Sequence, residues 1–171
     1  MLSIELLPFA SLRFVRRIKR QLFLVNLIIK DWKFMNQDQI KEQAQAFIAA
    51  LQTLENNGSE GVDQIVDLFS NDAELTNPAI EREGAARVGR TQIAGFWQTY
   101  RTAFCEIRSE FFEVTLSEHA AGLFWRSTGA HVTGEPVSYE GVSLLNFNDD
   151  GKIVRFKGFY DSNQVTTKVS V

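Results

Sequence analysis

The sequence contains little cysteine, proline or histidine. Its 171 residues include one cysteine, three prolines and two histidines. A single cysteine cannot form an internal disulfide, which suits a reducing compartment, and we therefore predict a cytoplasmic location. The histidines lie twelve residues apart without a matching carboxylate spacing, and the sequence has no phosphate-binding loop and no dinucleotide fingerprint. We accordingly expect neither a bound metal nor a cofactor.

Positive charge is scarce outside the N-terminal segment. Residues 1–34 hold seven basic and two acidic side chains, whereas residues 35–171 hold eleven basic and nineteen acidic ones. A domain with that excess of negative charge is poorly suited to bind the phosphates of a nucleic acid. We therefore expect no nucleic-acid partner for residues 35–171.

Residues 1–34 lack an apolar run long enough to cross a bilayer. As a basic and apolar extension, this segment can form an amphipathic helix that contacts an anionic membrane or a partner protein. The alternative is that translation begins at Met35, because Asn36 and Gln39 stand in the spacing of a helix capping box. Both interpretations place one domain over residues 35–171, and membrane contact is expected only if the extension belongs to the native protein.

Hydrophobic periodicity predicts an α+β domain. Apolar residues three and four apart indicate helices over residues 40–54, 62–69 and 91–104. A short strand ends at Pro78, and a period of two then predicts strands over residues 111–116, 121–131, 137–147 and 152–160. Because short turns join these strands, neighbours should be antiparallel. We expect a curved antiparallel sheet wrapped around three helices, a cone with an internal pocket.

Several stretches within residues 36–165 support this fold by resemblance. They are 44-AQAFIAALQTLENNG-58, 65-IVDLFSNDAELTNP-78, 89-GRTQIAGFW-97, 106-EIRSEFFEV-114 and 138-SYEGVSLLNFNDDGKIVRFKGFYD-161. In order and content they resemble the nuclear transport factor 2-like superfamily, a cystatin-like fold, and especially its SnoaL-like branch. This scaffold carries isomerases, cyclases, hydrolases, ligand binders and docking modules, so the resemblance implies a fold and leaves the activity open.

The ketosteroid isomerases of this superfamily use a carboxylate base, a tyrosine and a protonated carboxyl group. The resemblance places these groups at Asn77, Phe47 and Ser143 of this chain. An amide cannot take a proton from carbon, a phenyl ring cannot hydrogen-bond an enolate, and one serine is a weak oxyanion donor. The resemblance therefore implies that the protein is not a standard ketosteroid isomerase.

SnoaL-type polyketide cyclases carry an acid/base aspartate at the end of the last strand, and Asp161 occupies that position here. We therefore predict Asp161 as the catalytic residue if the protein is an enzyme. Strand alternation argues the other way, because Phe156, Gly158 and Tyr160 share one face and Asp161 falls on the opposite one. Only a twist or bulge at the strand end turns Asp161 inward.

The same alternation and the isomerase comparison select the pocket wall. On the long strand we expect Phe124 and Arg126 to face the pocket, with an exposed Arg126 at the strand end as the alternative. Trp97 and Tyr100 of the third helix are either core or lining residues. The predicted ligand-pocket residues are Phe47, Asn77, Trp97, Tyr100, Phe124, Arg126, Tyr139, Ser143, Phe156 and Tyr160.

The sequence supports two functional hypotheses. The first is a domain that binds a small, largely apolar organic molecule, with cofactor-free isomerase, cyclase or hydrolase chemistry at Asp161. The second is a non-catalytic binding or docking module. Burial of both Asp161 and Arg126 in the pocket favours catalysis, and exposure of both favours binding. Since the superfamily often dimerises through the outer sheet face, where Val142 and Leu144 fall, we also expect a homodimer.

Overall fold

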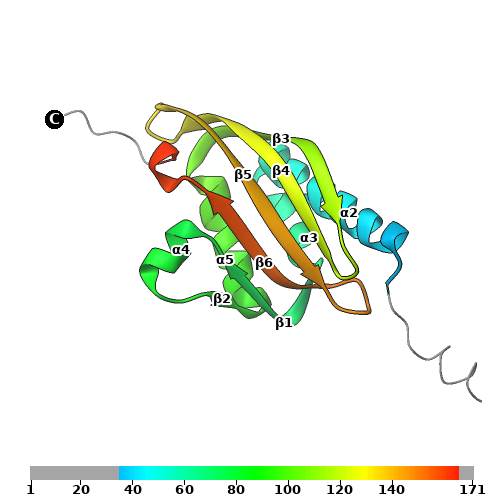
Figure 1. Cartoon of the computed structure of the whole chain (residues 1–171). Coiled ribbons are helices and arrows are strands. Elements are labelled where there is room, and N and C mark those ends of the chain that lie inside the picture. Colours follow the sequence, from blue (N-terminus) through cyan, green and yellow to red (C-terminus); the bar gives the residue numbers. More distant parts are fainter. Residues whose placement is uncertain (1–34, 166–171) are drawn as a thin grey trace, which may run out of the picture. The chain divides into compact units, whose positions relative to one another are not determined.

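The computed structural model describes residues 35–165 (Figure 1). The predicted extension over residues 1–34, and any membrane contact through it, lies outside the described residues. Within residues 35–165, no helix is both long and apolar enough to cross a membrane. The described chain contains helices that pack on one face of a single six-stranded sheet, as an α+β fold requires.

Helix α2 (Gln37–Asn57) begins at the predicted capping box. The Asn36 side chain accepts a hydrogen bond from the Gln39 backbone N–H, and the Gln39 side chain accepts one from the Asn36 N–H, both at 2.9 Å. The helix ends at Gly58, whose φ of 72° suits a residue without a Cβ. The predicted capping box is confirmed, and the helix is longer than the periodic stretch of residues 40–54.

Two further helices lie on the same side of the sheet. After the 3₁₀ turn η1 (Gly58–Gly61) comes α3 (Val62–Val66), which is shorter than predicted because Phe69 already belongs to a strand. Helix α5 spans Gly89–Thr102. Its predicted last residue, Phe104, instead begins the next strand, so the helical period was extended too far.

The strands that the structure describes are β1 (Phe69–Thr76), β2 (Arg87–Val88), β3 (Phe104–Leu116), β4 (Ala120–His131), β5 (Pro136–Phe147) and β6 (Ile153–Tyr160), in the order β2-β1-β6-β5-β4-β3. Strands β3 to β6 are antiparallel to their neighbours, as their short turns predict. Strand β1 pairs with β6 in parallel, a pairing that no short turn could predict because most of the domain separates the two strands.

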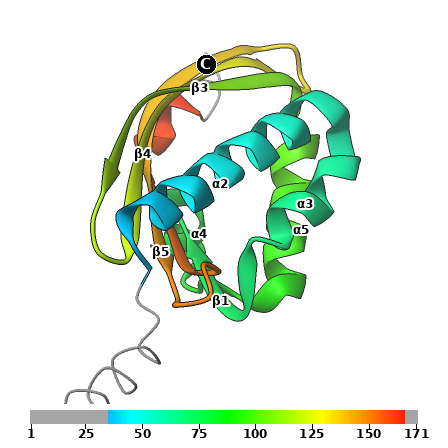
Figure 2. The same cartoon turned by 90° about the vertical axis from the view of Figure 1, so that its right-hand side faces the viewer.

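The sheet curves around the helices to form a cone (Figure 2). Helix α2 packs against β3 and β4, and α5 packs against β1. A register shift between Phe111 and Glu113 leaves Phe112 as an extra residue in β3. Such a bulge bends its strand and increases the local twist, which helps β3 to wrap over α2.

A short helix, α4 (Pro78–Glu83), was not predicted. Asn77 is its N-cap, Pro78 its first residue, and Gly84 ends it in the left-handed conformation with φ 84°. These residues are ordinary helix start and stop signals. Proline is favoured at the first position of a helix because the N–H that it lacks would have no partner within the helix. A helix of six residues is too short to show a hydrophobic period, so periodicity alone does not predict it.

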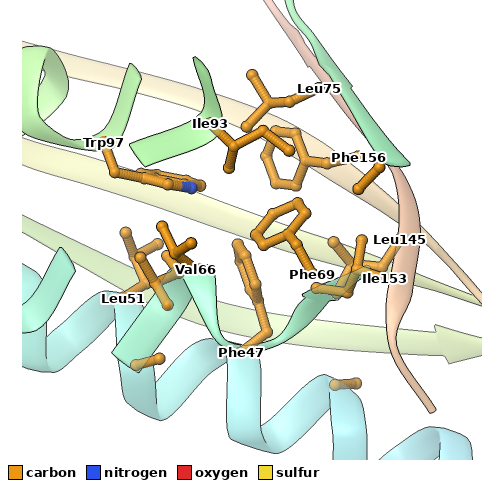
Figure 3. Close-up of a cluster of buried hydrophobic side chains, with 14 of the residues drawn as sticks. Phe47, Leu51, Val66, Phe69, Leu75, Ile93, Trp97, Leu145, Ile153 and Phe156 are labelled. Atoms are coloured by element: carbon orange, nitrogen blue, oxygen red, sulfur yellow. The ribbon is translucent and has the colours of Figure 1, made fainter. Parts of the chain in front are cut away.

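Aromatic side chains join the helices to the sheet. The rings of Phe47 on α2, Trp97 on α5 and Phe156 on β6 lie 5.6–6.0 Å apart, centre to centre, in edge-to-face or tilted pairs. Figure 3 shows these three side chains converging within the main cluster of buried apolar residues. These ring contacts hold both α2 and α5 against strand β6.

We predict that Asn36→Ala lowers the free energy of unfolding by about 1 kcal/mol, because the first turn of α2 loses its side-chain acceptor. Urea denaturation followed by circular dichroism measures this change. Asn36→Asp is the matched control, since aspartate retains the acceptor and should leave the midpoint nearly unchanged. Equal midpoints for the wild type and Asn36→Ala would contradict the assigned role of the cap.

Candidate functional site

An internal cavity of about 70 Å³ lies between α2, α5 and the concave face of the sheet. A single buried water needs roughly 10–15 Å³ of cavity volume, so the space admits a few waters or a small organic molecule. It is smaller than the ligand pockets of about 300–1,000 Å³ that hold drug-sized molecules. A steroid or polyketide would fit only if wall side chains moved.

Most of the predicted pocket residues line this cavity. They are Phe47, Asn77, Trp97, Tyr100, Ser143, Phe156 and Tyr160. Tyr139 is buried just behind the wall, where its ring packs 5.4 Å from Trp125 and 5.7 Å from Tyr160. Placement alone does not test a role in binding, which stays a prediction for each of these residues.

The predicted inward face of β4 is wrong. Trp125 pairs with Gly141 and Ser127 with Tyr139 across the sheet, and directly paired residues point to the same face. Phe124 and Arg126 therefore lie on the outer face, where the exposed Arg126 donates from Nε to Glu140 Oε1 at 2.7 Å. The charge of Arg126 was the signal that could have assigned the face correctly, because a buried guanidinium needs a partner.

Asp161 does not reach the cavity. It is exposed, and its Oδ1 accepts hydrogen bonds from Asn163 N at 2.9 Å and Nδ2 at 3.0 Å, which caps the 3₁₀ turn η2 (Ser162–Gln164). The register shift in the pairing of β6 with β5 lies between Ile153 and Arg155, and from Arg155 to Tyr160 the pairing is regular. The strand alternation therefore holds to its end, and the predicted catalytic placement of Asp161 is contradicted.

A buried carboxylate beside the cavity was missed in the sequence. Glu55, in the last turn of α2, is 6% exposed and accepts from Tyr100 Oη at 2.8 Å, Ser109 N at 2.9 Å and Ser109 Oγ at 2.6 Å. The hydroxyls of Ser109 and Ser127 lie 2.7 Å apart. Glu55 falls four residues after Leu51 on the inner helix face, a spacing that could have revealed it.

The cavity wall also contains Leu51, Ser109, Trp125, Ser127 and Gly158, which the sequence analysis did not select. The indole of Trp125 lies against Gly141, where an added Cβ would stand 2.6 Å from Trp125 Cζ2. The indole Nε1 donates to Ser143 Oγ at 3.0 Å. A side chain at position 141 would therefore displace Trp125 from the cavity wall.

Asn77 is fixed by its role as a helix cap. Its Oδ1 accepts hydrogen bonds from the backbone N–H groups of Ala79 and Ile80, both at 2.9 Å. These two donors establish which amide atom is the oxygen, so the other atom, Nδ2, is a hydrogen-bond donor. No residue in the range 35–165 hydrogen-bonds to Nδ2. Gly158 lets this side chain approach the sheet, because a Cβ there would lie 3.3 Å from Asn77 Cβ. Asn77 can therefore donate a hydrogen bond to a ligand but has little capacity to accept one.

All three tyrosines of the chain adjoin this site. Burial raises the pKa of Tyr100 well above its usual value, and the nearby Tyr139 and Glu55 add to the effect. Burial likewise raises the pKa of Tyr139, with Tyr160 next to it. The pKa of Tyr160 is also raised by burial, although the Arg82 guanidinium opposes the shift. The three phenols are therefore neutral donors and acceptors at physiological pH.

One further polar atom in the wall lacks a partner. The indole Nε1 of Trp97 is buried, and no acceptor within residues 35–165 reaches it. Neither His119 nor His131 lines the cavity; the ring of His131 instead contacts the carbonyl oxygens of Ala103 and Val165. The site thus offers neutral hydrogen-bonding groups and aromatic walls, with its one adjacent carboxylate already hydrogen-bonded.

Comparison with known proteins identifies the family. A sequence profile of the SnoaL-like domain matches residues 33–156, which is most of the chain, so the protein belongs to the SnoaL-like domain family. A search of curated proteins finds no match. The predicted membership of the nuclear transport factor 2-like superfamily and its SnoaL-like branch is confirmed.

Solved structures share the fold at low sequence identity. An NTF2-like protein of unknown function from Burkholderia pseudomallei is 16% identical with a TM-score of 0.64, covering 78% of this chain and 100% of its own. One from an Exiguobacterium species is 19% identical with a TM-score of 0.60, covering 70% and 98%. TerC, co-crystallised with polyporic acid, is 17% identical with a TM-score of 0.61, covering 73% and 93%. These similarities confirm the cone fold.

We predict that the tyrosines titrate later in the native protein than in the unfolded chain. Tyrosinate absorbance should be smaller in native buffer than in guanidinium chloride above about pH 10, with Tyr160 titrating first. Because the native state then retains protons that the unfolded state has lost, the contribution of the tyrosines to the free energy of unfolding should be constant up to that pH and decrease as the pH rises further. Superimposable titration curves for the native and unfolded protein would contradict the assigned burial.

Proposed function

We propose that this SnoaL-like domain binds a small, uncharged, largely apolar organic molecule in its internal cavity, as a binding protein. The observation that carries the proposal is the amide of Asn77. Its oxygen is committed to capping α4, while its Nδ2 has no partner among the described residues and belongs to a cavity-lining side chain. Asn77 is only 6% exposed, and a ligand oxygen would give its amide donor the acceptor that the described residues do not supply.

The neighbouring groups support the same interpretation. Ser143 pairs with Gly158 across the sheet, and Gly158 lies against Asn77, so the three residues meet at one end of the cavity. Ser143 Oγ accepts from Trp125 Nε1, which leaves the serine hydrogen free to donate. A carbonyl oxygen of the ligand would therefore receive donors from Asn77 and Ser143, with the aromatic walls enclosing its apolar part.

The positions of Asp161 and Arg126 favour binding over turnover. Both are exposed and outside the cavity wall, which is the arrangement expected for a non-catalytic module. The isomerase base position holds Asn77, and the tyrosine position holds Phe47. We therefore assign no isomerase, cyclase or hydrolase step to these residues. The structural neighbour TerC, which was co-crystallised with polyporic acid, supports an organic ligand at the level of the fold.

We predict that 2-butanone, a compact acceptor ligand, binds the wild type and that Asn77→Asp weakens binding about tenfold or more. Aspartate keeps the helix cap but replaces the donor by an acceptor that repels the ligand oxygen. Chemical-shift titration of the Trp97 and Trp125 indole N–H groups measures the affinity. Asn71→Asp, on the exposed part of β1, is the matched control for the added charge.

The result can contradict the proposal in two ways. Absence of saturable shifts with the wild type would argue against a ligand pocket. Equal affinity of the wild type and Asn77→Asp would argue against Asn77 as the donor. Unchanged thermal stability of Asn77→Asp is needed to show that the cap, and with it α4, is intact.

We also propose a homodimer through the outer sheet face. Phe112 and Phe159 are 62% and 43% exposed there. The Phe112 ring lies 6.4 Å from that of Phe124, and Val142 pairs with both Phe124 and Phe159 across the sheet. Apolar residues gathered on an exposed sheet face support a partner surface, and a second copy of the chain presents the same surface.

A cytoplasmic location also stays a prediction.

We predict that the wild type sediments as a dimer at micromolar concentration and that the double variant Phe112→Asp/Phe159→Asp sediments as a monomer. The carboxylates would be buried without partners at such an interface. Val88→Asp is the matched control, because Val88 is 54% exposed but lies on β2 at the far edge of the sheet. A monomeric wild type would exclude this dimer.

A further inference from the structure

We infer that Glu55 makes the cavity polar in one direction, so that one end accepts hydrogen bonds and the other end donates them. The ligand class that fits is a neutral molecule with a carbonyl oxygen at one end and an O–H or N–H donor at the other. This inference rests on the proposed binding function and adds a second recognition element to it, at the end opposite Asn77.

Three hydrogen bonds surround the Glu55 carboxylate. A carboxylate only accepts hydrogen bonds, and here three donors reach it: Tyr100 Oη, Ser109 N and Ser109 Oγ. None of the ion pairs among residues 35–165 includes Glu55. These three donors are therefore the contacts that compensate the buried carboxylate, and their hydrogens are committed to it.

The committed hydrogens determine the orientation of the next hydroxyl. A serine or tyrosine hydroxyl has one hydrogen. Since the hydrogen of Ser109 points to Glu55, the 2.7 Å contact between Ser109 and Ser127 requires Ser127 to donate. The oxygens of Tyr100 and Ser127 are both in the cavity wall and then have only lone pairs left for a ligand, although Ser127 also hydrogen-bonds with Tyr139. This end of the cavity consequently accepts hydrogen bonds and repels a carbonyl or ether oxygen.

The opposite end has the reverse character. Asn77 Nδ2 and the hydrogen of Ser143 are available there, because other contacts occupy the Asn77 oxygen and a lone pair of Ser143. Ser127 lies four residues along β4 from Leu123, the strand partner of Ser143, which is roughly 13 Å of strand. The two ends are therefore separate, and a ligand that reaches from one towards the other must carry a different group at each end.

Two isosteric probes test this polarity. 3-Acetylpyrrole and 3-acetylfuran share the carbonyl group and differ only in the ring atom, which is an N–H donor in pyrrole and an oxygen acceptor in furan. We expect the wild type to bind 3-acetylpyrrole about tenfold more tightly, since one probe gains a hydrogen bond and the other leaves acceptors facing its oxygen. Chemical-shift titration of the Trp97 and Trp125 indole N–H groups provides both dissociation constants.

The variant Glu55→Gln tests the cause. The amide of glutamine has a donor in place of one carboxylate oxygen, which frees a hydroxyl hydrogen of Tyr100 or Ser109. The hydrogen bonds of these hydroxyl groups then no longer all point towards residue 55. We expect Glu55→Gln to bind the two probes with about equal affinity or to prefer 3-acetylfuran. Glu42→Gln, on the exposed face of α2, is the matched control and should keep the tenfold preference.

A second variant keeps the test decisive if Glu55→Gln does not fold. Ser127→Ala removes one acceptor but leaves Glu55 with its three donors, and it should reduce the preference severalfold. Equal binding of the two probes by the wild type would overturn the inferred polarity while leaving the proposed pocket intact. An unchanged preference in Glu55→Gln would overturn the role of Glu55. Binding of neither probe would overturn the proposed function and this inference together.

Discussion

The hydrogen bonds of the buried Glu55 carboxylate hold one end of the cavity wall together. Glu55 lies in the last turn of helix α2, Tyr100 comes from α5, and Ser109 comes from β3, so the hydrogen bonds of one side chain join two helices and the sheet. Ser127 extends the connection to β4. Charge buried among apolar residues is tolerated only when its hydrogen bonds are made, so these elements must keep their relative positions for Glu55 to remain stable. The cavity wall is built on that constraint.

The other end of the cavity depends on a helix cap. The residue at which related isomerases carry a carboxylate base is Asn77 here, and it begins α4. The side-chain oxygen of Asn77 accepts the two hydrogen bonds of the cap, so this side chain can offer a ligand only the N–H donors of its amide. Gly158 permits the close approach of Asn77 to the sheet, and Ser143 completes this end from the next strand. The same cone therefore lacks an isomerase base and still presents ordered donors to its interior.

Much of the fold was predictable from local pattern. The three main helices, the antiparallel strands β3 to β6 and the capping box at Asn36 all follow from periodicity and short-range hydrogen bonding. The errors occur where the local pattern is ambiguous. Strand β4 carries large side chains on both faces, so the choice between Phe124 and Trp125 as the inward ring depended on its register with β5. Helix α4 was missed because six residues contain too little periodicity.

Local sequence patterns were enough to predict the α+β class, the element order, the outward direction of Asp161 and seven of the residues that line the cavity. The contact of Glu55 with Tyr100 and Ser109, which lie 45 and 54 positions further along the chain, arises only when the chain is folded. The tertiary structure also decided the parallel pairing of β1 with β6 and the faces of β4. The difference lies in the separation of the interacting residues along the sequence. Helical and strand periods are properties of neighbouring residues, whereas strand register and the hydrogen bonds of a buried charge depend on how distant segments pack together.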